Sequence, residues 1–515
     1  SGRLVKDKSG EWRISSDDNS KVEHLTGTTN GDDNGEYWKI TTADGTQYWF
    51  GLNRLTGYAS GNEETGSTWT VPVYGDDSGE PCYNATFANA YCTQAWRWNL
   101  DYVVDPHGNA LSYFYGTETN YYTQGLKTTE NGKPYIRGGY LKRIDYGQRD
   151  KQVYTTKPAA QVVFTTAERC VGSLTDCSAS ALTDATAADW PDVPWDQNCK
   201  ANTKCPGQNS PTFWTRKKLT KITTQIRTGD SAYTPVDEWK LTHLFTDNGD
   251  ASKSLWLNKI DHTGKVGTDV SVPSVELNGT KLPNRVDESG DNLLPFYRYR
   301  LSSVLNESGG ALSVNYAANQ CTPGNVPAED SSVKRCFPVK WNPPGVTDPI
   351  TDWFHKYVVG SVVQTDLTGD NADQVTSYTY VGDAGWRKTP ADGISKSEYR
   401  TWSDWRGYGK VQVVTSAGTN SASNTKTEHV YFRGLDGDVN KAGATRSVKV
   451  TDSTGGSYDD SDWKAGQELE TITYDGDVVT EKSVTVPWTA VTATEVRDWA
   501  TYQARYVATG SVDTY

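Results

Sequence analysis

The sequence predicts an all-β protein built as an extended sheet of repeated β-hairpins. The stretch 100–115 (LDYVVDPHGNALSYFY) aligns without gaps with 301–316 (LSSVLNESGGALSVNY), which is an internal repeat. Each copy has an apolar run, a polar turn that contains Gly, and a second run that ends in Tyr, the pattern of a β-hairpin. The chain also holds 47 Gly, 30 Tyr and 19 Trp, and aromatic residues fit well on pleated sheets.

The segment 1–167 carries the first strand patterns. Residues 37–40 and 47–50 flank a turn and form a predicted hairpin with aromatic rings on both arms. Beyond the first copy of the repeat, further strands are expected at 139–147 and 161–165. We therefore expect 1–167 to be an N-terminal run of hairpins.

Residues 168–214 interrupt this rhythm. They hold four of the eight cysteines, a Pro-spaced stretch at 191–195, and an Ala/Thr/Asp-rich stretch that predicts a short helix near 183–190. Two small disulfide loops can hold such a segment, which has little apolar core of its own. We predict a disulfide-stapled insertion on a face or rim of the sheet.

The strand patterns resume over 215–515. Clean alternation at 219–226 predicts a sheet that is solvated on one face, and 492–506 is the one place near the end where a helix is expected. The further strands expected in this part lie at 257–264, 357–364, 375–381, 409–415, 427–432, 446–451 and 469–474.

Charge and length exclude several classes of protein. The chain has 51 Lys and Arg against 64 Asp and Glu, a net charge of −13, so the basic footprint of a nucleic-acid-binding protein is missing. No run of 18 apolar residues exists, which argues against a membrane-spanning helix. Methionine is absent even at position 1, so we expect a processed product or a fragment of a longer protein.

The eight cysteines fall into four local pairs, each of which brackets a loop-like segment. An even number of cysteines in neighbouring pairs predicts local disulfides, and persistent disulfides indicate an oxidising, extracellular compartment. Metal binding is disfavoured because no C-x-x-C motif occurs, and free buried cysteines are the remaining alternative. The predicted pairs are Cys82 with Cys92, Cys170 with Cys177, Cys199 with Cys205, and Cys321 with Cys336.

No linear motif for catalysis or for a cofactor is present. G-x-S-x-G, H-E-x-x-H and the phosphate loop are all missing, so we expect no catalytic, cofactor or metal residue and no enzyme activity. His107 and His262 occupy equivalent positions of the repeat pattern and are interpreted as turn residues.

Two patterns of acidic residues leave alternatives open. The pairs Asp32-Asp33, Asp76-Asp77 and Asp459-Asp460, together with many Trp and Tyr, would suit carbohydrate binding or cleavage, although we favour turn chemistry. The loop from Asp366 to Asp373 offers oxygen ligands for calcium, but a solvated turn is the preferred interpretation.

Several of these segments resemble a known family. The stretches 105–115 (DPHGNALSYFY), 141–147 (LKRIDYG) and 474–476 (YDG) are similar to the repeats of RHS/YD-repeat proteins. The blocks 402–409 (WSDWRGYG) and 431–434 (YFRG) resemble the Arg-Gly-Phe/Tyr-Gly segments in the B component of insecticidal toxin complexes.

The region 44–53 together with 95–115 is also similar to secreted actinobacterial members of the RHS group. The resemblance covers most of the chain and places it upstream of the regular repeat array. It implies a sheet wound into a hollow shell around a C-terminal toxin domain, which would lie beyond residue 515 and be delivered to a competitor cell. The family's autoproteolytic core motif does not occur here, so no catalytic residue carries over.

Three functions follow from these expectations. The first is a non-enzymatic encapsulating scaffold of a secreted or cell-surface toxin. The second is a polysaccharide-binding or glycoside-cleaving protein with exposed aromatic platforms. The third is a teneurin-like cell-surface adhesin, in which the same shell displays a binding surface and carries no cargo.

Overall fold

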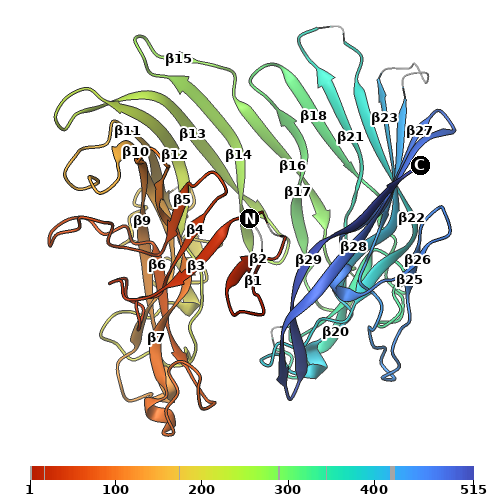
Figure 1. Ribbon diagram of the computed structural model, residues 1–515, viewed down its shortest axis with the longest axis horizontal. Coiled ribbons are helices and arrows are strands. Elements are labelled where there is room, and N and C mark those ends of the chain that lie inside the picture. Colours follow the sequence, from red (N-terminus) through yellow and green to blue (C-terminus); the bar gives the residue numbers. More distant parts are fainter. Residues whose placement is uncertain are drawn as a thin grey trace. The chain divides into compact units, whose positions relative to one another are not determined.

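The computed structural model describes residues 3–16, 18–172, 174–287, 290–343, 345–369, 371–417 and 424–515. The chain divides into two compact units, which we call unit 1 (Ser1–Phe245 with Lys253–Val272) and unit 2 (Thr246–Ser252 with Pro273–Tyr515). In the described residues the regular structure is β-strand, with short 3₁₀ turns between strands. In both units the long strands follow one another across an antiparallel sheet in chain order (Figure 1).

Unit 1 contains one main sheet and two smaller hairpins. Neighbouring strands of the main sheet, β3 to β5 and then β8 to β13, pair in sequence order. The small hairpins pair β1 with β2 and β6 with β7. The strands are β1 (Leu4–Lys6), β2 (Trp12–Ile14), β3 (Lys21–Leu25), β4 (Tyr37–Thr41), β5 (Gln47–Phe50), β6 (Thr68–Tyr74), β7 (Tyr91–Trp98), β8 (Leu100–Val104), β9 (Asn109–Tyr122), β10 (Lys133–Arg149), β11 (Ala160–Glu168), β12 (Lys217–Arg227), β13 (Tyr233–Asp247), β14 (Lys253–Gly264) and β15 (Val270–Ser271).

Unit 2 repeats this plan. Its main sheet runs through β16, β17, β18, β21, β22, β23, β24, β27, β28 and β29, and β19–β20 and β25–β26 form separate hairpins. The strands are β16 (Val275–Pro283), β17 (Tyr297–Leu305), β18 (Gly310–Tyr316), β19 (Cys336–Trp341), β20 (Ile350–His355), β21 (Val359–Asp366), β22 (Gln374–Arg387), β23 (Asp404–Ala417), β24 (Thr425–Tyr431), β25 (Lys449–Thr451), β26 (Ser457–Asp459), β27 (Glu468–Asp475), β28 (Val478–Arg497) and β29 (Ala500–Thr514).

Both copies of the sequence repeat are hairpins, as predicted, and both have the same internal hydrogen bonds. The first residue of each turn, Asp105 or Asn306, accepts two backbone N–H bonds from its own turn through its side chain. The closing Tyr then donates its hydroxyl to the carbonyl of the opening Leu, at 2.7 Å from Tyr115 to Leu100 and at 2.9 Å from Tyr316 to Leu301. The repeat therefore encodes a turn and a Tyr-to-Leu hydrogen bond that closes the hairpin, which we call the clasp.

Large parts of both sheets form a single layer. All residues of β17, and all but the first of β14, are half-buried, so neither face of these strands is packed against a second layer. A compact protein of 56.8 kDa exposes roughly 19,000 Å², and two compact proteins of half that mass together expose roughly 22,000 Å². This chain exposes 27300 Å², so a large share of its sheet surface is hydrated on both faces.

Burial alternates along β9, which other segments of unit 1 cover. Alternate residues of β9 are buried over most of its length, and the insertion and the β6–β7 hairpin pack in this region. The alternation predicted at 219–226 is not seen, because most residues of β12 are half-buried whichever face they occupy. The sequence pattern at 219–226 thus predicts the strand correctly, but it does not show that one face of the strand is buried.

Two predicted helices are wrong. The stretch 183–190 holds only the 3₁₀ turn Ala187–Asp189. Trp190 precedes Pro191, which disfavours helical backbone there, and its φ of −116° and ψ of 67° are not helical. The stretch 492–506 lies in the β28–β29 hairpin instead. Seven of its fifteen residues are Thr, Val, Tyr or Trp, which favour strands, and this propensity overrides the apparent helical spacing.

Asp101 on β8 is a fully buried carboxyl group with a structural role. Its Oδ2 accepts bonds from the Asn53 backbone N–H at 2.7 Å, the Ser67 hydroxyl at 2.7 Å and the Thr65 hydroxyl at 3.0 Å. It thereby ties the loop between β5 and β6 to the first repeat hairpin. Burial raises the pKa of Asp101 to about 7, although these bonds act in the opposite direction.

A pH dependence of stability follows from Asp101. Its pKa in the unfolded chain is about 3.9, so the folded protein binds this proton more tightly, and the stabilisation is complete below about pH 4. As the pH rises towards 7, we expect this contribution to the free energy of unfolding to be lost, at up to about 1.4 kcal/mol per pH unit. Urea unfolding of wild type and Asp101→Asn between pH 4 and 8 checks this. Parallel stability curves for the two proteins would contradict the assignment.

Candidate binding site

The structure contains four disulfides, which join the cysteines that are neighbours in sequence. The Cα–Cα distances are 5.0 Å for Cys82–Cys92, 6.0 Å for Cys170–Cys177, 5.7 Å for Cys199–Cys205 and 6.3 Å for Cys321–Cys336. Two of them lie in the connection between β11 and β12, which is the segment interpreted as an insertion. Non-reducing peptide mapping of the protein is expected to return these four pairs and no free thiol.

The insertion has a small core of its own. Trp190 is only 1% exposed and packs with Cys170, Leu182 and Val193. The ends of the insertion are held together by the Arg169 backbone N–H, which donates to the Arg216 carbonyl at 2.8 Å. The buried Trp190 and the Cys170–Cys177 disulfide thus organise this part of the insertion, whose described residues form no strand.

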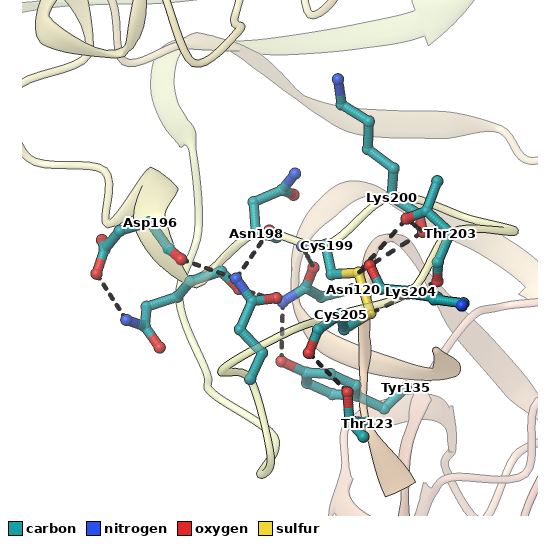
Figure 2. Close-up of a disulfide and its surroundings, with 12 residues drawn as sticks. Asn120, Thr123, Tyr135, Asp196, Asn198, Cys199, Lys200, Thr203, Lys204 and Cys205 are labelled. Atoms are coloured by element: carbon teal, nitrogen blue, oxygen red, sulfur yellow. Dashed lines mark hydrogen bonds between the residues drawn. A yellow bond between two sulfur atoms is a disulfide. The ribbon is translucent and has the colours of Figure 1, made fainter. Parts of the chain in front are cut away.

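The second disulfide loop docks onto β9 and β10, as Figure 2 shows. The Asn120 side chain accepts a bond from the Cys199 backbone N–H at 2.9 Å, and Thr123 donates to the Cys205 carbonyl at 2.6 Å. The Tyr135 hydroxyl accepts bonds from the Asn120 amide and the Thr212 backbone N–H. These buried contacts fix the loop on the sheet.

Removing this disulfide is expected to loosen the loop without unfolding the sheet. A closed loop of this length stabilises the folded state by roughly 2 kcal/mol. The double variant Cys199→Ser/Cys205→Ser should therefore exchange amide hydrogens at 198–208 about thirtyfold faster than wild type. Exchange in β22 and β23 of unit 2 serves as the internal control. Unchanged protection at 198–208 would show that the hydrogen bonds alone hold the loop.

A buried ionic cluster lies where the insertion rejoins β12. The carboxylate of Glu118 on β9 lies 3.2 Å from Arg137 Nη2 on β10, and both side chains are almost completely buried. Thr215 and the Arg216 backbone N–H also donate to Glu118. Arg216 and Lys217 pair with Glu168 at 3.4 and 2.6 Å. Burial lowers the pKa of the Arg137 guanidinium, and Glu118 acts in the opposite direction.

A β-bulge turns Arg137 into this cluster. The register between β9 and β10 shifts between Ile136 and Gly138, and a bulge of this kind redirects the side chain of the extra residue. The Arg137 guanidinium then lies 3.4 Å from the centroid of the Trp214 ring. The bulge therefore connects the sheet to the end of the insertion.

Next to the cluster lies an open pocket of about 420 Å³ with aromatic walls, which we call the aromatic pocket. Its floor is the backbone of Gly138 and Gly139, where a Cβ atom on Gly139 would lie 2.7 Å from the Trp69 ring. Its walls come from β6, β7 and the end of the insertion, namely Trp69, Trp96, Phe213 and Trp214. Trp96 lies 5.5 Å from Trp69 and 4.7 Å from Phe213 between ring centroids.

Polar groups line the same pocket. Arg97 is exposed, its guanidinium lies 5.0 Å from the centroid of the Trp69 ring, and its Nε donates to the Asn99 side chain at 3.0 Å. Among the described residues no carboxylate pairs with Arg97. Two buried nitrogen atoms, Nε of Arg137 and Nε1 of Trp214, have no hydrogen-bond partner in the described part of the chain. The pocket therefore combines ring faces with one exposed guanidinium, that of Arg97.

The acidic residues singled out in the sequence have mostly structural roles. Asp32 accepts three backbone N–H bonds, which include the one from Ala95, and Asp460 also accepts three. In the described residues one group of three acidic side chains lies close enough to share a metal ion, the largely exposed Asp76, Asp77 and Glu80.

The loop from Asp366 to Asp373, which we interpreted as a solvated turn with calcium as the alternative, forms hydrogen bonds within itself. The carboxylate of Asp366 accepts bonds from Thr368, Gly369 and Asn371, as in the solvated turn that we favoured, and Asp370 lies outside the described residues.

The two histidines assigned to turns differ. His107 lies in the exposed turn between β8 and β9, as predicted. His262 lies within β14 instead, where its ring stacks on Trp239 at 4.7 Å and its Nε2 lies 3.0 Å from Asp237 Oδ1. Its turn assignment is wrong, because β14 continues through the repeat-like stretch to Gly264.

Within the described residues, no helix is both long and apolar enough to cross a membrane. Sequence reasoning missed the aromatic pocket, because its residues come from five separate segments of the chain. The only local signals were the Gly138-Gly139 pair inside a strand and the Phe213-Trp214 pair after the last insertion cysteine.

No protein-family model and no curated protein sequence matches the chain. Among solved structures, TcdB2-TccC3 is similar over 99% of this chain and 39% of its own, with 9% identity and a TM-score of 0.44. The TcdB2-TccC3-Cdc42 structure is similar over 100% and 38%, with 10% identity and a TM-score of 0.45.

The N-terminal domain of the effector SpvB from Salmonella typhimurium strain LT2 is similar over 49% of this chain and 68% of its own. Its identity is 14% and its TM-score 0.26. The chain thus spans less than half of the length of the TcdB2-TccC3 chains that it matches.

Proposed function

We propose that this chain is a wall segment of a non-enzymatic, extracellular scaffold of the RHS type, which encloses a toxin domain of the same polypeptide. The observation that carries the proposal is the single-layer sheet, whose strands are half-buried on both faces. A solid domain packs one face of its sheet against a second layer. A wall instead has one face towards the outside and one towards an interior space.

Two further features support this function. The main-sheet strands pair in chain order, and the longer connections between some of them lie outside the ladder, so such a wall can grow along the chain without rearrangement. Four disulfides support an oxidising, extracellular location. The sequence resemblance to RHS repeats supports the toxin as cargo and a competitor cell as its target.

Protease protection tests the proposal. The full natural polypeptide that contains this chain would be digested with increasing amounts of a nonspecific protease, and the fragments identified by mass spectrometry. We expect the enclosed domain to survive as long as the β-wall is intact and to be digested once the wall is denatured. Digestion of that domain at the rate of a free domain would contradict enclosure.

A separate assay tests our expectation that this chain does not cleave polysaccharides. The purified chain would be incubated with acidic and neutral polysaccharides, and the release of new reducing ends measured. We expect none above the level of a heat-denatured control. Release of reducing ends would contradict a non-enzymatic role and favour polysaccharide cleavage as the function.

A further inference from the structure

We propose that the aromatic pocket of unit 1 binds a carboxylated sugar unit of an acidic glycan. This function is separate from enclosure of a cargo, since the pocket lies in unit 1 and is complete there. It would give the scaffold a means of attachment to a glycan-bearing surface.

The walls of the pocket suit a pyranose ring. Ligand pockets are mostly apolar concave sites of about 300–1,000 Å³ with a few polar groups that fix orientation, and this one has a volume of about 420 Å³. The Trp96 ring comes from β7 and the Phe213 ring from the end of the insertion, and the two lie side by side. Aromatic faces pack against the apolar face of a sugar, while its hydroxyl groups remain free for hydrogen bonds.

The donors of the pocket select for a carboxylate. Arg97 uses its Nε on Asn99, so its two Nη groups remain available, and a guanidinium binds a carboxylate through two parallel bonds. The chain as a whole carries a net charge of −13. An exposed arginine without a carboxylate partner in the described structure is thus a local site for an anion on an otherwise acidic protein.

The pocket is also organised before any ligand arrives. The wall residues Phe213 and Trp214 follow directly on Thr212, whose backbone N–H and carbonyl both bond the Tyr135 hydroxyl. On the other side, Trp96 Nε1 donates to the Ile136 carbonyl at 2.9 Å. Fixed walls reduce the entropy lost on binding.

Calorimetric titration of the complete chain with trigalacturonate and 3′-sialyllactose tests the proposal, with maltotriose and lactose as neutral comparators. We expect at least one carboxylated probe to bind at least about tenfold more tightly than its neutral comparator. Arg97→Gln should weaken this binding about tenfold or more. Arg227→Gln on β12 removes another exposed positive charge, outside the pocket, and should leave the affinity unchanged.

A second pair of variants tests the aromatic wall without disturbing the core. Phe213 is 49% exposed and lines the pocket, whereas Phe87 is 66% exposed and lies outside it. Phe213→Ala should weaken binding severalfold, and Phe87→Ala should not. The proposal is overturned if no carboxylated probe binds, if neutral probes bind equally well, or if Arg97→Gln and Phe213→Ala bind like wild type.

Discussion

Replacement of Asp460 by Ala is expected to lower the free energy of unfolding of unit 2 by about 4 kcal/mol. The fully buried carboxylate of Asp460 accepts the backbone N–H groups of Arg433 and Gly434, both at 2.7 Å, and of Leu435 at 3.1 Å. The variant leaves these donors without an acceptor in a buried loop, and each unpaired buried donor costs about 1–3 kcal/mol. Urea unfolding followed by tryptophan fluorescence measures the loss.

The neighbouring residue provides a matched control. Asp459 is exposed and pairs with Lys449 at 2.9 Å, so Asp459→Ala should change stability by less than about 1 kcal/mol. Asp460→Asn keeps one carbonyl oxygen as acceptor and should fall between the two. Equal stability of Asp460→Ala and Asp459→Ala would show that water replaces the carboxylate and that the loop is not held as described.

Trp190→Ala is expected to open the insertion while the sheet of unit 1 stays folded. The indole is the largest group in the small core of the insertion, and removal of a buried tryptophan costs about 3–5 kcal/mol. Because the other fully buried members of this core, Cys170, Leu182 and Val193, are much smaller, we expect the cost to fall on local opening of the insertion. We expect cleavage by thermolysin within 169–216 to become about a thousandfold faster.

Trp488→Ala is the control for Trp190→Ala, because Trp488 on β28 is 51% exposed. Its cleavage pattern and rate should match those of wild type. If Trp190→Ala instead produces cuts throughout unit 1, the insertion is part of the main folding unit. If it produces no faster cleavage, the two disulfides alone hold the insertion.

The local elements of the fold were predictable because their signals are local. The alternation of apolar run, Gly-containing turn and closing Tyr predicted both repeat hairpins, since the Tyr115 and Tyr316 clasps use residues of the same repeat. The four disulfide pairs follow from proximity in sequence. The strands at 37–40 and 47–50 also needed only their own rings and the turn between them.

Features that depend on distant segments could not be predicted in this way. The sequence around Asp460 does not indicate that its carboxylate accepts the backbone N–H groups of 433–435, because those donors lie about 25 residues away. The aromatic pocket needs the bulge at Arg137, the insertion and the β6–β7 hairpin together. The 492–506 helix failed for a related reason, because its strand state depends on the pairing of β28 with β29.

A density map of the full-length natural protein, obtained by electron cryo-microscopy, tests the scaffold function most directly. We predict a hollow particle with a wall one β-sheet thick and additional density inside it. A particle made of compact, solid domains with no enclosed space would contradict the scaffold function, and would leave glycan binding by the aromatic pocket as the function to pursue.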